Sequence, residues 1–307
     1  MSDRPRILVT GASGFVGRHL VPALIRSGHD LRLALRRPQP VPDGVEAVVT
    51  GELDAATDWG EALAGVDHVV HLAGLAHAGP GLDEQLYERV NTRATLALAD
   101  AAIRAGIRRF VYLSSIKAVT GASQGPVADE DEPRPTDAYG RSKRAAEQGL
   151  AHRDLDWVAL RPVLVYGTGV KANMAALMRL ARLPLPLPLG GLTEPRSMLA
   201  VENLCDAIGF ALSPACPARR CYIVSDGEPV SIREIIAALR EGQGRAPGLL
   251  SIPPSWLAGL AGLVGRQDRF AKLSGGLLAP PVALLRTGWR PPLAAREALR
   301  RLGAAAG

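Results

Sequence analysis

The sequence has few cysteines and no long apolar run. Three cysteines, Cys205, Cys216 and Cys221, occur among 307 residues, an odd number with no histidines at metal-binding spacing. This pattern excludes a disulfide framework, predicts free thiols and indicates no metal site. Because no run of 18 apolar residues is present, we expect no membrane-spanning helix. The amino-terminal residues also lack the hydrophobic segment of a signal peptide, so we expect a cytoplasmic protein.

The sequence also lacks a basic tail, a stripe of interleaved aromatic and basic residues, and any internal repeat. Without the first two features, a nucleic-acid partner is not indicated. The formal net charge of +6 suits an anionic ligand, although the arginines are scattered along the chain. Hydrophobic residues make up 47% and charged residues 21% of the chain, as is ordinary for a globular protein. We therefore expect a small-molecule partner, with neither a nucleic-acid nor a membrane partner.

The strongest motif stands near the amino terminus. Apolar residues at 7–9 predict a buried parallel strand, and Gly11, Gly14 and Gly17 follow at G-x-x-G-x-x-G spacing before a helical apolar period begins. Such glycines permit a sharp turn, close approach of backbone N–H groups to a pyrophosphate, and close helix packing. The helix N-terminus then directs its positive dipole end at the phosphates. Three glycines alone are often only a turn, but the flanking strand and helix favour a dinucleotide site.

Strands and helices alternate through the first half of the chain. This alternation predicts an α/β protein with a Rossmann-type doubly wound parallel sheet and helices on both faces. We expect a NAD(P)-binding domain at 1–165 and a smaller, mixed substrate domain at 166–307, with segments near 196–224 returning to the sheet. The expected strands lie at 7–9, 31–35, 45–49, 66–74, 110–113 and 157–160, with helices at 85–105 and 139–150.

Four further segments carry local signals. The acidic, proline-rich loop at 126–135 is expected to be a solvated face without chemistry. The repeated prolines of 183–189 exclude a helix and predict an extended segment. A helix at 231–240 begins with an N-cap serine and a glutamate at the capping-box position. The tail at 253–302 is expected to be helical and interrupted by prolines.

The end of the second expected strand lacks the carboxylate that NAD-binding folds commonly place there for the ribose hydroxyls. Arg36 and Arg37 stand at this position instead. Two guanidinium groups can bind a 2′-phosphate, which favours NADP(H) over NAD. The alternative is a solvated basic turn. In the fourth expected strand, a single His71 is better explained by packing than by ligand binding.

Tyr139 and Lys143 are spaced i, i+4, so their side chains share one helix face. A lysine ammonium and an oxidised nicotinamide ring beside a tyrosine favour the phenolate and lower the phenol pKa. The phenol can then act as acid or base at a carbonyl or alcohol during hydride transfer. Alone, such a pair is commonly a surface pair. Its place after a dinucleotide loop and a pair of serines favours chemistry.

Ser114 and Ser115 end the fifth expected strand, at the edge where open α/β sheets bind ligands. A serine hydroxyl at this edge can hydrogen-bond the reacting oxygen of a substrate. Because side chains alternate along a strand, the two serines face opposite sides, and we favour Ser115 for this hydrogen bond.

Several motifs together resemble the extended short-chain dehydrogenase/reductase family. They are Thr10-Gly-Ala-Ser-Gly-Phe-Val-Gly17, His71-Leu-Ala-Gly74, Ser114-Ser115 and Tyr139-Gly-Arg-Ser-Lys143. Within that family the chain is most similar to the branch of nucleotide-sugar epimerases, dehydratases and 4-ketoreductases, of the UDP-glucose 4-epimerase type. The resemblance continues through 161–167, 196–204 and 288–292, and so covers nearly the whole chain.

The resemblance implies a cofactor site, a substrate site and an acid–base group. Catalysis falls to Tyr139, Lys143 and one of the serines, Ser115 or Ser114. Substrate contacts fall to Ser115, to Asn173 near the nucleotide base, and to Arg196, whose guanidinium fork suits a sugar diphosphate. The cofactor contacts carried over are Gly11, Ser13, Gly14, Phe15, Val16, Gly17, Arg36, Arg37, Glu52, Leu53, Leu72, Ala73, Gly74, Asn91, Tyr139, Lys143 and Pro162.

The resemblance also implies an activity. It indicates an NAD(P)-dependent oxidoreductase acting at C4 of a UDP-hexose or UDP-N-acetylhexosamine derivative, either a 4-ketoreductase or a 4-epimerase. An epimerase implies tightly bound NAD, and a reductase implies exchangeable NADPH. A reductase of a non-sugar ketone of the flavonoid or steroid type and a non-catalytic cofactor-binding sensor remain alternatives. Members of the family commonly form homodimers through two helices of the first domain.

The chain departs from the family pattern at three places besides the second strand. Leu164 replaces a common asparagine, Val119-Thr120-Gly121 replaces Val-Tyr-Gly, and Ala94-Thr95 replaces Gly-Thr. These differences bear on the sugar and on the cofactor, and leave the hydride chemistry unchanged.

Overall fold

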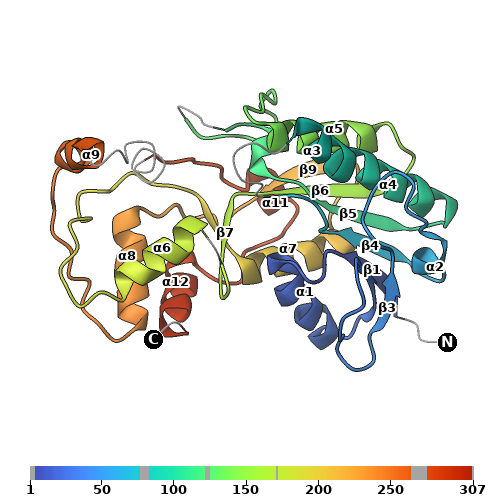
Figure 1. Cartoon of the computed structure of the whole chain (residues 1–307), viewed down its shortest axis with the longest axis horizontal. Helices are drawn as coiled ribbons and strands as arrows, with labels where there is room; N and C mark the ends of the chain where they lie inside the picture. Colours follow the sequence, from blue (N-terminus) through green and yellow to red (C-terminus); the bar gives the residue numbers. More distant parts are fainter. Residues whose placement is uncertain (1–3, 77–82, 122–124, 171, 264–274, 306–307) are drawn as a thin grey trace.

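The computed structural model describes residues 4–76, 83–121, 125–170, 172–263 and 275–305, without the side chains at 172, 173, 260, 261 and 263 (Figure 1). The strands are β1 (Arg6–Thr10), β2 (Asp30–Leu35), β3 (Glu46–Val49), β4 (His68–His71), β5 (Arg109–Leu113), β6 (Trp157–Pro162), β7 (Leu164–Tyr166), β8 (Met198–Ala200) and β9 (Arg220–Val224). The helices are α1 (Phe15–Arg26), α2 (Gly60–Leu63), α3 (Glu84–Tyr87), the π-helix η1 (Glu88–Arg93), α4 (Ala94–Arg104), the 3-10 helix η2 (Ile116–Ala118), α5 (Ala138–Ala151), α6 (Ala172–Ala181), α7 (Val201–Leu212), α8 (Ile232–Gly242), α9 (Pro254–Leu263), α11 (Val282–Arg286) and α12 (Ala295–Ala304).

Seven parallel strands form the main sheet in the order β3-β2-β1-β4-β5-β6-β9. The order runs outward in opposite directions from β1 and β4, so the predicted doubly wound α/β sheet is confirmed. The last strand, β9, comes from the second half of the chain. β8 pairs with β7 in a separate parallel pair.

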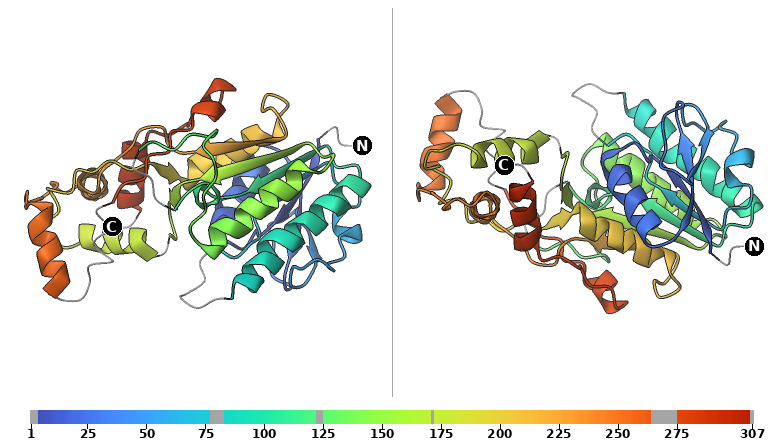
Figure 2. Two further views of the ribbon diagram at one scale, coloured as in Figure 1. Left: turned by 90° about the horizontal axis from the view of Figure 1, so that it is seen from above. Right: turned by 90° about the horizontal axis from the view of Figure 1, so that it is seen from below.

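Successive residues of each central strand face opposite sides of the main sheet. Ile7 and Val9 belong to one hydrophobic core and Leu8 to another. Helices α1 and α7 cover the first core, whereas α2, α4 and α5 cover the second. Figure 2 shows α4 and α5 over one face in its left view and α1 and α7 over the other face in its right view. Burial on both faces explains why these strands read as nearly continuous apolar runs.

Helices α6, α8 and α12 form a carboxyl-terminal lobe beside the sheet (Figure 1). The lobe has its own core, which includes Met174, Ile235 and Leu299. Helix α8 begins with the predicted capping box, in which Ser231 and Glu234 satisfy each other's backbone N–H groups. The segment 183–189 contains no regular helix or strand, in agreement with its prolines.

The structure corrects two expectations from the sequence. The expected helix at 85–105 is continuous in direction but contains the six-residue π-helix η1 between α3 and α4. The acidic loop at 126–135 is not wholly a solvated face. Its Asp129 is half-buried and accepts hydrogen bonds from the backbone N–H groups of Ile223 and Ala283, so it fastens the loop to β9 and α11. Burial raises the pKa of this carboxyl group.

The described residues contain no helix that is both long and apolar enough to cross a membrane. Within the same residues, no cluster of histidine, cysteine, aspartate and glutamate could hold a metal ion. The three cysteines are free thiols, of which Cys205 and Cys216 are buried. Part of the predicted helical tail, residues 264–274, lies outside the described residues; the rest contains α9, α11 and α12.

Candidate active site

The loop between β1 and α1 is shaped by its glycines. Gly11 has a φ of +72°, and a Cβ atom there would stand 2.7 Å from the backbone nitrogen of Ala73. A Cβ atom at Gly17 would stand 2.4 Å from the Gly11 carbonyl oxygen. Only glycine, which has no Cβ atom, therefore allows α1 to pack so close to the loop. Helix α1 has Gly14 as its N-cap, no side-chain cap and no acidic residue in its first turn. Its N-terminus is therefore open to an anionic group.

The other predicted cofactor residues lie along the same edge of the sheet. Since the strands are parallel, the residues that follow β1, β2, β4, β5 and β6 all meet at their carboxyl ends. This edge holds Ser13, Phe15 and Val16 after β1, Arg36 and Arg37 after β2, Glu52 and Leu53 after β3, Leu72, Ala73 and Gly74 after β4, and Pro162 at the end of β6.

Asn91 braces the segment that follows β4. It is fully buried within the π-helix. Its side-chain oxygen accepts from the backbone N–H of Leu75 at 2.7 Å, and its amide donates to the Leu75 carbonyl and to Ser142 Oγ, each at 3.0 Å. The π turn thus connects the end of β4 with α5. Such turns are frequent at functional sites.

The two serines at the end of β5 have different partners. Ser114 donates to Glu147 Oε1 at 2.6 Å and is committed to a buried ion pair between Glu147 and Arg161. The Ser115 hydroxyl lies close enough to the Tyr139 phenol to lower the phenol pKa. The same hydroxyl accepts from the backbone N–H of Lys117 at 3.2 Å. Of the two serines, only Ser115 therefore stands with the predicted acid–base residue.

Helix α5 begins with a tight local arrangement. Asp137 is its N-cap and accepts from the backbone N–H of Gly140 at 2.7 Å. The same carboxylate forms an ion pair with Lys117 Nζ at 2.6 Å. A Cβ atom at Gly140 would stand 2.3 Å from the Lys117 carbonyl oxygen, so the glycine lets α5 press against the loop after β5. This contact places Tyr139 beside that loop.

In the protein without cofactor, the phenol of Tyr139 is protonated at neutral pH. Burial raises its pKa to about 12, although the nearby Ser115 hydroxyl opposes this shift. The sequence predicted a lowered pKa with a nicotinamide ring and Lys143 alongside. In this structure Lys143 points elsewhere, and the cation over the Tyr139 ring is Lys117, with Nζ 6.0 Å from the ring centroid.

Lys143 is only 4% exposed. Its Nζ donates to the carbonyl oxygen of Leu113 at 2.9 Å and lies 4.7 Å from the centroid of the Tyr112 ring. A Cβ atom at Gly74 would be 3.3 Å from the same nitrogen, which places Lys143 beside the segment after β4. Burial lowers the pKa of Lys143 to about 8, and the negative charge of Glu147 opposes this shift.

The basic end of β2 is exposed. Arg36 forms an ion pair with Glu52 at 3.5 Å, and Arg37 is exposed beside it. An exposed ion pair of this kind contributes little to stability, so it does not prevent Arg36 from binding another anion.

The predicted substrate residues lie farther along the chain. Arg196 precedes β8 and forms a backbone bridge with Val230. Its guanidinium is half-buried, which lowers its pKa. The side chain of Asn173 lies outside the described residues. The structure therefore brings together the glycine loop, Ser115, Tyr139, Lys143 and Asn91 at one edge of the sheet.

Sequence reasoning missed several residues of the site. Lys117, Tyr112 and Glu147 contact the predicted catalytic residues or Ser114. Glu147 follows Lys143 by four residues on the same helix, a spacing that could have indicated it. Nothing local to Lys117 or Tyr112 indicates such a role, because both contacts join residues far apart in the sequence.

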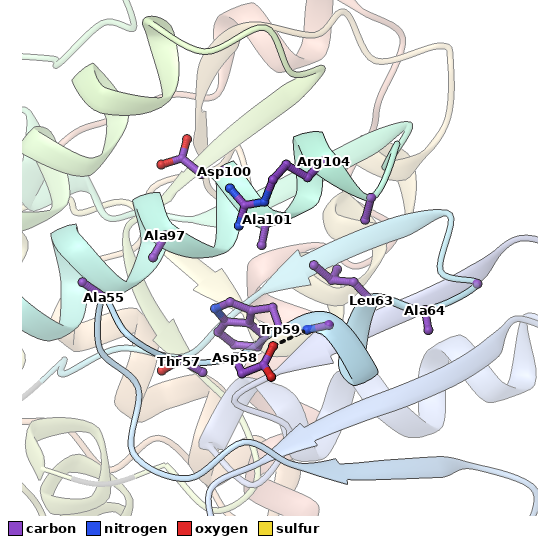
Figure 3. Close-up of a pocket in the computed structure, with 13 residues that line it drawn as sticks. Ala55, Thr57, Asp58, Trp59, Leu63, Ala64, Ala97, Asp100, Ala101 and Arg104 are labelled. Carbon is purple, nitrogen blue, oxygen red and sulfur yellow. Dashed lines mark hydrogen bonds between the residues drawn. The ribbon is translucent and has the colours of Figure 1, made fainter.

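A separate cavity of about 650 Å³ lies between α2 and α4 (Figure 3). Trp59 lies between the two helices, with Asp58 on one side and Asp100 and Arg104 above it. None of the predicted catalytic, cofactor or substrate residues lines this cavity. It is therefore distinct from the site at the edge of the sheet.

Comparison with known proteins places the chain in a family. Residues 7–220 match the model of the NAD dependent epimerase/dehydratase family. A UDP-glucose 4-epimerase of Vibrio cholerae is 36% identical over 96% of this chain and 93% of its own length. A 3-beta-hydroxysteroid dehydrogenase of Mycolicibacterium neoaurum is 28% identical over 80% of this chain and 72% of its own length.

A solved structure, MoeE5 in complex with UDP-glucuronic acid and NAD, superposes with a TM-score of 0.74 at 27% identity, over 97% of each chain. The match thus extends beyond the dinucleotide loop into the carboxyl-terminal lobe. The family model, the sequence relative and the superposition agree, and the chain belongs to the NAD dependent epimerase/dehydratase family.

Proposed function

We propose that this chain is an NAD(P)-dependent 4-epimerase of a UDP-hexose or UDP-N-acetylhexosamine derivative. The observation that carries the proposal is the placement of the Ser115 hydroxyl beside the Tyr139 phenol, with Lys143 buried on the same helix as Tyr139. The identity of 36% with a UDP-glucose 4-epimerase across 96% of the chain supports the sugar nucleotide and the C4 position. In this proposal residues 1–165 bind the cofactor and residues 166–307 form most of the substrate site.

The loop after β1 fits a dinucleotide. The uncapped N-terminus of α1, with no carboxylate in its first turn, suits a pyrophosphate. Gly11, Gly14 and Gly17 would hold that group, Ala73 and Gly74 would line it, and Asn91 would keep their segment in place. When bound, the nicotinamide supplies reversible hydride transfer at C4.

Tyr139 moves the proton in this mechanism. As a phenol it donates a proton from Oη to the sugar oxygen when a C4 carbonyl is reduced, and it accepts that proton when the C4 hydroxyl is oxidised. Ser115 orients the same sugar oxygen by a hydrogen bond. In this structure the Lys143 ammonium is bound to the Leu113 carbonyl, so it favours the deprotonated form of Tyr139 only if it turns toward the phenol when the cofactor binds.

Arg196 and Asn173 are assigned to the nucleotide part of the substrate. A half-buried guanidinium suits a diphosphate, because the group offers paired N–H donors and loses little hydration on binding. Replacing Arg196 by leucine should raise KM for a UDP-sugar at least tenfold. An unchanged KM would favour a neutral, non-sugar ketone, a class to which the 28% identical steroid dehydrogenase points.

A 4-ketoreductase is the second candidate, and Arg36 and Arg37 favour it. Their guanidinium groups suit the 2′-phosphate of NADP(H), which an enzyme that exchanges its cofactor after each turnover draws from the cellular pool. An epimerase instead keeps one nicotinamide nucleotide through many turnovers.

The deciding experiment identifies the cofactor in the purified protein. NAD(H) that survives gel filtration, together with interconversion of C4 epimers of a UDP-sugar followed by NMR, is the expected result. An empty protein that binds NADPH at least tenfold more tightly than NADH in fluorescence titrations would favour the ketoreductase. A folded protein that binds cofactor and turns over neither epimers nor 4-keto sugars would contradict both proposals.

A further inference from the structure

The ring of Tyr112 lies against the ammonium group of Lys143. Lys143 Nζ is 4.7 Å from the ring centroid, within the range of a cation–π interaction. Tyr112 is fully buried and Lys143 is 4% exposed, so water screens this attraction little. The ammonium donates to the carbonyl oxygen of Leu113, which leaves two N–H bonds of Lys143 for other partners.

The acidic residue near Lys143 does not form an ion pair with it, which leaves the Tyr112 ring as a group that contacts the ammonium. Glu147 is the acidic residue on the same helix, but its carboxylate binds Arg161 and Arg144. The carboxylate attracts Lys143 from a distance without taking its N–H groups. A ring face likewise attracts the charge, and it does not form a competing ion pair.

The ring of His71 stacks on Tyr112, with the ring centroids 5.9 Å apart and the planes inclined by 19°. Thr95 Oγ1 donates to the Asn91 carbonyl, so it accepts from His71 Nε2, and His71 Nδ1 then accepts from Thr10 Oγ1 at 2.7 Å. This arrangement fixes a neutral imidazole. Burial, together with the smaller effect of the Lys143 charge, lowers the pKa of His71 to about 3.

We propose that Tyr112 is a positioning residue, whose ring face holds the Lys143 ammonium in place by a cation–π interaction while the neutral His71 packs against that ring. The inference rests on the proposed role of Lys143 in the oxidoreductase site. Thr10 lies next to the glycine loop and Asn91 braces the segment after β4, so the stack also links Lys143 to the cofactor loop.

The direct test measures the ionisation of Lys143. The chain has four lysines, Lys117, Lys143, Lys171 and Lys272, so protein labelled with ¹³C-lysine gives few resonances. The resonance that is missing from the spectrum of Lys143→Met is assigned to Lys143. Its pKa is then measured by NMR titration in the wild type, Tyr112→Phe and Tyr112→Leu. Leucine removes the ring and should lower the pKa by about one unit, whereas phenylalanine keeps the ring and should leave it unchanged.

A matched control is available on the same strand. Phe110 is fully buried in the same core and contacts His71, with no contact to Lys143 among the described residues. Phe110→Leu should therefore reduce stability as Tyr112→Leu does and leave the pKa of Lys143 unchanged. The hydroxyl of Tyr112 makes no hydrogen bond of normal geometry in the described residues, although Thr95 lies near it, so its loss in Tyr112→Phe is a mild change.

If Tyr112→Leu does not fold, pentafluorophenylalanine at position 112 replaces it. This ring keeps the shape of phenylalanine, but fluorine withdraws the electron density that attracts a cation, so the same fall in pKa is expected. An equal pKa in the wild type, Tyr112→Phe and the ring-altered variant would overturn the proposal.

The pH dependence of cofactor binding provides a second measurement. The pH at which affinity for NAD(H) or NADPH declines should move down with the pKa in Tyr112→Leu and stay in place in Tyr112→Phe. Both readouts are independent of substrate turnover. A positive result in a protein without 4-epimerase or 4-ketoreductase activity would therefore refute the proposed function and leave the role of Tyr112 intact.

Discussion

Tyr139 is held in position by two neighbours with different chemistry. The Ser115 hydroxyl lies beside its phenol, and Asp137 caps the helix that carries it. The neighbouring Ser114 is bound to Glu147 and belongs to the interior behind the site. The division of roles between the serines follows from the alternation of side chains at the end of β5.

Tyr139→Phe should therefore fold, bind cofactor normally and lose turnover. Removing a general acid–base group typically costs a factor of about 10²–10⁴ in rate. Steady-state turnover and a fluorescence titration with the nicotinamide cofactor measure the two properties separately. Tyr222→Phe is a suitable control, because Tyr222 donates to the Pro217 carbonyl away from the site. Normal turnover in folded Tyr139→Phe would rule out the catalytic assignment.

The buried ammonium of Lys143 should make the wild type less stable at neutral pH than a variant with an uncharged side chain at this position. Its pKa is lowered from 10.5 to about 8. Between pH 8 and 10.5 the folded protein releases a proton that the unfolded chain still holds, so stability rises with pH across this window. Lys143→Met should remove this rise and be about 1–3 kcal/mol more stable at pH 7. Urea unfolding of both proteins at pH 7 and pH 10 measures the effect, and parallel pH profiles would contradict it.

Individual residues also show how far the sequence could predict the site. Ser115, Tyr139 and Lys143 were identifiable because their motif places them on one strand end and one helix face. Tyr112 and Lys117 were not, because their contacts with these residues depend on how α5 packs against β5 and η2. The burial that raises the pKa of Tyr139 in the absence of cofactor also comes from tertiary packing, which the motif does not show.

At the scale of elements, α5 is clamped to β6 by a buried ion pair. Glu147 and Arg161 are 1% and 3% exposed in their side chains, and two hydrogen bonds of 2.9 and 2.8 Å join them. Ser114 adds a third bond to the same carboxylate. The clamp lies one helical turn beyond Lys143, so it also fixes the helix face that carries Tyr139 and Lys143.

Removing one partner of this pair should be costly. Arg161→Met leaves the Glu147 carboxylate buried with too few partners and should reduce the free energy of unfolding by about 3–5 kcal/mol. The double variant Glu147→Leu, Arg161→Met removes both charges of the pair and should recover much of that loss. Urea unfolding of the two variants and the wild type measures both changes. A double variant as unstable as Arg161→Met would contradict this account, because the loss would then not come from the unpaired carboxylate.

The elements that the sequence predicted well are the apolar strands of the main sheet and the capped helix α8. Their signals are local, since a strand buried on both faces needs an apolar run and a helix start needs its capping residues. The π-helix around Asn91 has no such signal, because one extra residue in a helical turn leaves the apolar periodicity nearly unchanged. Asp129 was missed because its partners, Ile223 and Ala283, come much later in the chain.

At the scale of the whole molecule, a buried carboxylate joins the sheet to the carboxyl-terminal lobe. Asp226 follows β9 and is 3% exposed. It accepts hydrogen bonds from the backbone of Ala200, from Asn203 and from the hydroxyl of Tyr166. The same hydroxyl oxygen lies 3.1 Å from the Ala295 carbonyl oxygen at the start of α12, so its single proton is shared between the two acceptors. Elements that belong to the sheet and elements that belong to the carboxyl-terminal lobe therefore meet at the side chain of Asp226.

Asp226 should make the protein less stable as pH rises through the acidic range, the opposite of the usual effect of a carboxyl group. Burial raises its pKa from 3.8 to about 6, despite the three hydrogen bonds that lower it. Between about pH 4 and pH 6 the folded protein holds a proton that the unfolded chain has released, so stability from this group falls as pH rises through that window. The full fall is at most about 3 kcal/mol.

Asp226→Asn isolates this contribution. The asparagine oxygen can accept from Ala200 and Asn203, and its amide can donate to the Tyr166 hydroxyl, which then donates to Ala295. The variant cannot titrate, so its stability relative to the wild type should rise by about 2–3 kcal/mol between pH 4 and pH 6.5. Urea unfolding across this range measures the difference. A constant difference would show that the carboxyl group is already ionised at pH 4, held by its hydrogen bonds against the cost of burial.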